Sequence, residues 1–108
     1  MMMRLLEAMS DRDRVMFQGI MVDLLSNLSD EERVYYSYND LAGILHEKLR
    51  RVRIYRHFSY RYQVELLFEL CQEMEGLADD DENLQLYIID HIAECQSLGL
   101  KPLKEEII

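Results

Sequence analysis

Glycine and proline are scarce in this chain, which has four glycines and one proline among 108 residues. A β-sandwich or barrel of this length needs many tight turns, and these two residues supply most of them. The scarcity therefore favours long helices and makes an all-β fold the poorest class. With 49% hydrophobic residues, the chain is expected to bury one core. We predict a single all-α domain over residues 1–108, and leave open whether 1–9 and 100–108 are flexible.

Four stretches repeat apolar residues every three or four positions, which is the spacing of one face of an α-helix. The first helix is expected at 11–27, because Ser10 is a suitable N-cap and acidic residues fill the first turn. The second is expected from about 30 to 53, because Ser29 and Glu32 form a capping box in which each side chain satisfies a backbone amide.

The third helix is expected at 60–75, where Gly76 supplies the left-handed residue that commonly ends a helix. The acidic run 79–82 suits the start of a fourth helix, and Gly99 suits its end. The sequence thus predicts a small bundle of four helices.

Two points of this prediction stay open. Ser37 or Asn39 can start a new helix, which would split the second helix and give five in all. The segment 52–64 also alternates apolar and polar residues, as a half-buried strand does. A lone strand leaves its backbone groups unpaired, so we prefer helix-loop-helix there and keep a short strand or hairpin near 52–64 as the second reading.

The positive charge of the chain is concentrated between Lys48 and Arg61. This segment holds six of the twelve Lys and Arg residues and no Asp or Glu, so its charge is +6, whereas the rest of the chain carries −15. If residues 50–61 formed one continuous helix, several basic side chains would lie along a single stripe. Such a stripe would attract acidic partners.

Basic and aromatic residues in this segment are the candidate binding residues. Guanidinium groups bind carboxylates or phosphates in pairs of hydrogen bonds, and aromatic rings such as Tyr55, Phe58 and Tyr60 can stack on a partner. A pI near 4.7 opposes approach to a polyanion, so we favour pairing of the segment within the fold or across a dimer, with acidic residues such as those of 79–82, over nucleic acid. A protein partner with an acidic surface suits the segment equally well. The predicted partner-binding set is Lys48, Arg50, Arg51, Arg53, Tyr55, Arg56 and Arg61.

No catalytic, metal or cofactor site is predicted. His91 and Cys95 are four residues apart on one predicted helix, with Cys71 on another as a conceivable third metal ligand. Zinc sites normally take four ligands at tight spacings, and a cysteine on an apolar helix face is ordinarily a core residue. We therefore interpret all three as structural.

Arg51 and His57 stand six residues apart, and this spacing resembles the Arg and His of small helical ribonucleases called HEPN domains. In that family the arginine is usually followed by a polar residue and the pair lies within one helix, whereas Val52 follows Arg51 here. The resemblance covers these two residues and implies RNA cleavage as a third function class.

The sequence therefore predicts a non-enzymatic adaptor, inhibitor or regulatory subunit that acts by binding another protein. A nucleic-acid-binding regulator that uses residues 48–61 is the alternative, and a small helical ribonuclease is the third. The longest charge-free stretch, Val15 to Val22, is far short of the roughly 20 apolar residues that span a bilayer. With no export signal at the N-terminus, we expect a cytoplasmic protein.

Overall fold

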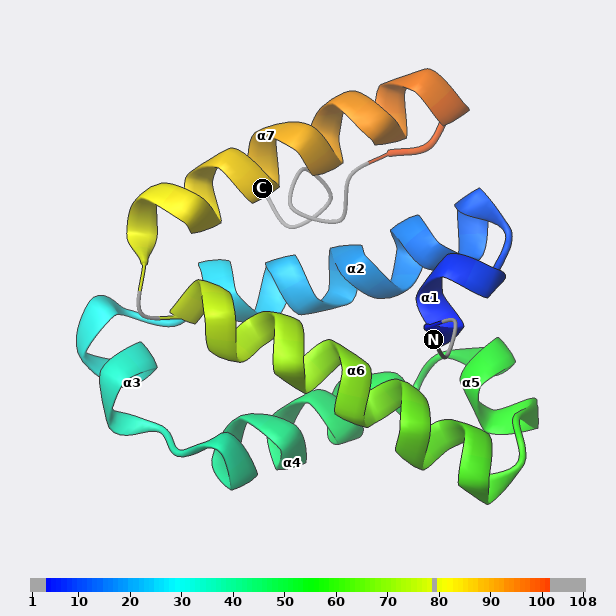
Figure 1. The fold of residues 1–108 in the computed structure, drawn as a ribbon, viewed down its shortest axis with the longest axis horizontal. Helices are drawn as coiled ribbons and strands as arrows, with labels where there is room; N and C mark the ends of the chain where they lie inside the picture. The colour runs from blue at the N-terminus through cyan, green and yellow to red at the C-terminus, as the bar shows by residue number, and fades with distance from the viewer. Residues whose placement is uncertain (1–3, 79, 102–108) are drawn as a thin grey trace.

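The computed structural model describes residues 4–78 and 80–101, and the all-α prediction is confirmed over these ranges. They form seven helices and no strand, so the second reading of 52–64 as a strand is wrong. None of these helices has the length and apolar character that crossing a membrane requires. The helices are α1 (Leu5–Ala8), α2 (Asp11–Ser26), α3 (Asp30–Tyr35), α4 (Tyr38–Leu49), α5 (Arg53–His57), α6 (Tyr60–Ala78) and α7 (Asp81–Leu98) (Figure 1).

Side-chain caps set several of the helix boundaries. The Ser10 hydroxyl accepts a hydrogen bond from the Asp13 amide at the start of α2, and Ser29 opens α3 with the predicted capping box. A second capping box at Ser37 starts α4, so the predicted second helix is split and the alternative at this position is right. Gly99 ends α7 with a left-handed backbone of φ 71°, as predicted.

One predicted boundary is wrong, and one question left open is answered. Gly76 does not adopt the left-handed backbone of a helix end, so α6 continues to Ala78; among the described residues Gly99 is the only glycine with a positive φ. The N-terminal segment is also helical from Leu5, and Leu6 is buried. The carboxylate of Glu69 on α6 accepts the backbone amides of Leu5 at 2.8 Å and Leu6 at 3.3 Å, which fixes α1 to the bundle.

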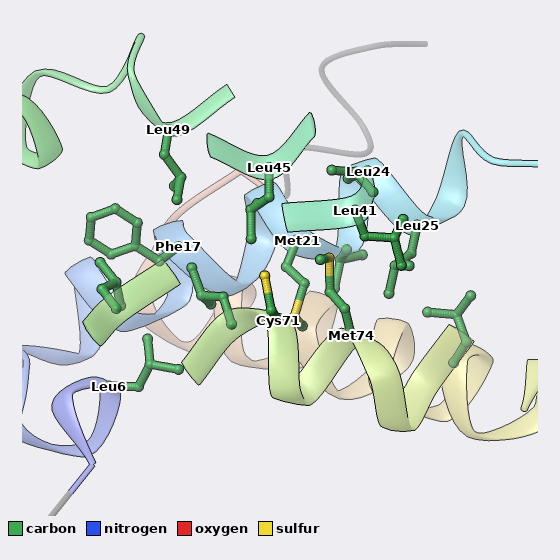
Figure 2. Close-up of a cluster of buried hydrophobic side chains, with 14 of the residues drawn as sticks. Leu6, Phe17, Met21, Leu24, Leu25, Leu41, Leu45, Leu49, Cys71 and Met74 are labelled. Carbon is green, nitrogen blue, oxygen red and sulfur yellow. The ribbon is translucent and has the colours of Figure 1, made fainter. Parts of the chain in front are cut away.

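The core lies between α2, α4 and α6, whose inward faces meet in one cluster (Figure 2). α1 packs on α6, and α7 packs on both α2 and α6. In Figure 1, α7 lies above α2, and α6 crosses the lower half of the molecule in front of α4. Residues 102–108, most of the C-terminal segment whose flexibility was left open, lie outside the described residues. The labelled core side chains are Leu6, Phe17, Met21, Leu24, Leu25, Leu41, Leu45, Leu49, Cys71 and Met74.

Candidate partner-binding surface

The basic segment folds around the five-residue helix α5, between α4 and α6. Val52 before α5 and Phe58 after it both have extended backbones, with ψ of 121° and 149°. Residues 50–61 are therefore not one continuous helix, so the condition for a single stripe of basic side chains is not met. α6 then begins where the Ser59 hydroxyl accepts the Tyr62 amide at 3.2 Å.

Tyr55 anchors α5 in the core instead of facing a partner. Its side chain is 1% exposed, and burial raises the pKa of its hydroxyl. The hydroxyl oxygen lies 3.3 Å from Nδ1 of His46, which is half-buried. The Gln63 side-chain amide donates to the carbonyl oxygens of Tyr55, at 2.8 Å, and Phe58, at 3.3 Å. Tyr55 lines the basic hollow described next, but with 1% of its surface exposed it offers a partner very little contact area.

Three of the predicted arginines line one open hollow beside α5. Its volume is about 580 Å³, and Arg50, Arg51 and Arg56 surround it together with the ring of Tyr60. Tyr60 is 81% exposed, so its ring is available at the rim of this hollow. Glu47 is the acidic residue of the lining, and it is already bound to Arg50 at 3.0 Å.

Arg53 lies at a second hollow, of about 520 Å³, whose lining is mainly apolar: Met16, Val52, Ile54 and Phe58, with Asp13 and His57 also contributing. This arrangement bears on the ribonuclease prediction. Arg51 lines the first hollow and His57 the second, and the non-helical Val52 separates α5 from α4. Arg51 and His57 therefore lack the shared helix that the HEPN resemblance implies.

The remaining basic residues of the predicted set already have carboxylate partners. Lys48 is half-buried on the other side of α4, with Nζ 3.9 Å from Asp23 on α2. Arg61 is 92% exposed and contacts Glu65 one turn further along α6, at 3.2 Å. Exposed pairs of this kind contribute little to stability, so Arg61 can exchange Glu65 for another carboxylate at small cost.

By contrast, Arg51, Arg53 and Arg56 are exposed and form no ion pair with any residue in 4–78 or 80–101. Within the acidic run 79–82, a possible internal partner of these arginines, Asp81 instead contacts Arg33 at 3.3 Å. The sequence therefore located the basic segment correctly but could not show which of its side chains bind within the fold. We call Arg50, Arg51, Arg53 and Arg56 the α5 basic surface.

His91 and Cys95 do contact each other, with Nε2 3.6 Å from Sγ, and both are buried on α7. Burial lowers the pKa of His91. Cys71 belongs to the core cluster of α2, α4 and α6, and the described residues contain no group of three side chains placed to hold a metal ion. That these three residues are structural stays a prediction.

His46 and Gln63 are the residues of this region whose roles the sequence did not reveal. Both act on Tyr55, and each is a single polar residue within an apolar helical stripe, which gives no sign of its partner. Comparison with known proteins finds no family model, no curated protein and no solved structure that matches the chain. Function must therefore be inferred from fold, charge and exposure.

Proposed function

We propose that the chain is a non-enzymatic adaptor, inhibitor or regulatory subunit that binds the acidic surface of a protein partner in the cytoplasm. The observation that supports this is the exposure of Arg51, Arg53 and Arg56 without an ion pair among the described residues, in a chain of net charge −9. Neighbouring like charges repel each other, so these arginines add nothing evident to folding. An acidic partner would neutralise them.

The shape of this region also suits a protein partner. Guanidinium groups form paired hydrogen bonds with carboxylates, and arginine and tyrosine are the residue types that contribute most at protein interfaces. Tyr60 at the basic hollow and the apolar lining of the second hollow offer contact area beside the charges. A partner surface that presents acidic residues around an apolar side chain fits both hollows.

The test is recovery of partners by affinity purification with matched variants. The wild-type chain is expected to retain at least one protein after nuclease treatment, and Arg51→Glu/Arg56→Glu is expected to lose it. Arg12→Glu changes an exposed arginine on α2 and is the control that should retain it. Identical recovery with all three proteins would contradict the proposal.

Nucleic acid remains the second candidate, because arginines lie beside the exposed ring of Tyr60. Of the other two aromatic residues considered for stacking, Tyr55 is buried and Phe58 is half-buried against Phe17 and Tyr62. We therefore expect no binding of a single-stranded RNA at about 0.15 M salt. Binding that Arg53→Glu/Arg56→Glu abolishes would replace the protein partner with nucleic acid.

A further inference from the structure

α6 carries an exposed apolar row that the α5 basic surface does not use. Tyr60, Val64 and Phe68 are spaced four residues apart, which places them along one side of the helix, and they are 81%, 46% and 55% exposed. Six large hydrophobic side chains are exposed in residues 4–78 and 80–101, and half of them lie in this row. Three such residues in succession are a candidate contact surface.

The charges beside this row are arranged symmetrically about Phe68. Arg61 lies seven residues before Phe68 and Glu75 lies seven residues after it, and both are exposed. In an α-helix this separation is about 10 Å along the axis in each direction. Arg61 pairs with Glu65 of its own helix at 3.2 Å, and this exposed pair can exchange Glu65 for the Glu75 of a second copy at small cost. One end of the row thus offers a guanidinium group and the other a carboxylate, at equal distances from its centre.

Gly76 provides an open position on the helix surface at the same distance from Phe68 as the Tyr60 ring. It lies eight residues after Phe68, as Tyr60 lies eight residues before it. Gly76 is exposed on α6, and apart from its chain neighbours and the backbone of its own helix, no atom of the described residues lies within 4 Å of the position that a Cβ atom would take. The helix surface there is flat and open, so a large ring can pack against the backbone.

We propose that α6 is the interface of a homodimer, in which two copies pack α6 against α6 in antiparallel orientation about a twofold axis at Phe68. The two Phe68 rings then meet at the centre. Arg61 of each copy faces Glu75 of the other, and each Tyr60 faces Gly76. A twofold axis repeats each of these contacts, so one surface serves as both halves of the interface.

Other arrangements of the same row match the charges less well. Parallel packing would place Arg61 against Arg61 and Glu75 against Glu75, which is repulsive. Antiparallel packing about Val64 would pair Tyr60 with Phe68 but would set Arg61 opposite Leu67 and leave Glu75 without a basic residue. The axis at Phe68 is the one that matches both charged ends.

The dimer and the proposed function share one residue, because the Tyr60 ring at the rim of the basic hollow also faces Gly76 of the second copy. Arg51, Arg53 and Arg56 take no part in the dimer, so each copy retains its own α5 basic surface. The variants Arg51→Glu/Arg56→Glu and Phe68→Glu therefore test the two proposals separately.

The test is light scattering coupled to size-exclusion chromatography at about 50 µM protein, in about 0.05 and about 0.5 M salt. The wild-type protein is expected to be a dimer at low salt, and Phe68→Glu is expected to be a monomer with unchanged helix content. Leu86→Glu is the control, because Leu86 is 55% exposed on α7 but outside the row, and it should leave the dimer intact.

Charge exchange tests the register. Arg61→Glu or Glu75→Arg alone should weaken dimerisation about tenfold, and the double variant Arg61→Glu/Glu75→Arg should restore it. A wild-type monomer at both salts would overturn the dimer, as would a dimer that survives Phe68→Glu. A dimer that Phe68→Glu disrupts but that ignores both charge reversals would overturn the axis at Phe68.

Discussion

Arginines in two regions of the molecule have opposite surroundings. Where α2 meets α7, the guanidinium group of Arg14 binds both carboxylate oxygens of Glu94, at 2.9 and 2.5 Å, and its side chain is 20% exposed. The pairing raises the pKa of Arg14 and lowers that of Glu94. Arg33 on α3 is 9% exposed and reaches Asp81 on α7 at 3.3 Å. These two arginines connect helices.

Around α5 the same residue type has no such partner within the described chain. Arg51 precedes α5 and Arg53 and Arg56 lie on it, and all three are exposed, whereas Tyr55 of α5 is buried in the core. The comparison shows that the residue type alone does not define a binding surface. What distinguishes the two regions is whether the fold brings a carboxylate to the arginine.

The largest effect is expected at Tyr55, because burial rather than charge holds α5 in place. Tyr55→Ala removes a ring that is 1% exposed and should lower the free energy of unfolding by about 3–5 kcal/mol. Tyr60→Ala, at an 81% exposed ring, is the control and should change it by less than about 0.5 kcal/mol. Urea denaturation measures both, and equal losses would mean that α5 is not anchored by Tyr55.

A smaller effect is expected where an arginine connects helices. Arg14→Ala should lower the free energy of unfolding by about 1–2 kcal/mol, because it breaks a paired hydrogen bond and leaves Glu94 without its cation. A double-mutant cycle with Glu94→Gln should show a coupling energy of about 1 kcal/mol, since both side chains retain contact with solvent. Additive losses would contradict a direct interaction.

The Arg14–Glu94 pair should make the stability difference between the wild-type protein and Glu94→Gln depend on pH. Arg14 lowers the pKa of Glu94 below its ordinary value of 4.5, so the folded state favours the ionised carboxylate. This contribution is fully present above that value and is lost as the pH falls through the lowered pKa. The wild-type protein should thus exceed Glu94→Gln in stability at neutral pH, and the gap should close in acid. Thermal unfolding across this range would show a constant gap if the pairing were absent.

Local signals in the sequence were sufficient for most helix boundaries. Ser10, Ser29 and Gly99 act on amides or carbonyls within their own turn, so their effect can be read from neighbouring residues. The partner that fixes α1 is Glu69, whose position is distant in sequence, and no local pattern reveals it. α5 has only five residues, too few to show which side of the helix is apolar. The sequence therefore gives no sign that Tyr55 lies in the core.

For the binding surface, the sequence identifies the basic segment but does not show which of its side chains are paired with carboxylates of the fold and which are exposed to a partner. Lys48 and Arg51 look alike in the chain, yet packing of α2 on α4 brings Asp23 to Lys48 and nothing comparable to Arg51. Whether a basic side chain is paired or unpaired depends on tertiary contacts between helices, and the proposed function rests on the unpaired ones.

The account is tested most directly by the free energy of unfolding of Arg51→Ala/Arg53→Ala/Arg56→Ala, measured by urea denaturation beside Arg14→Ala. If the three arginines serve binding and not folding, the triple variant should match the wild-type protein within about 1 kcal/mol, because alanine suits helices and relieves repulsion between like charges. A loss larger than that of Arg14→Ala would show that these arginines hold the fold together, and would contradict their assignment to a partner-binding surface.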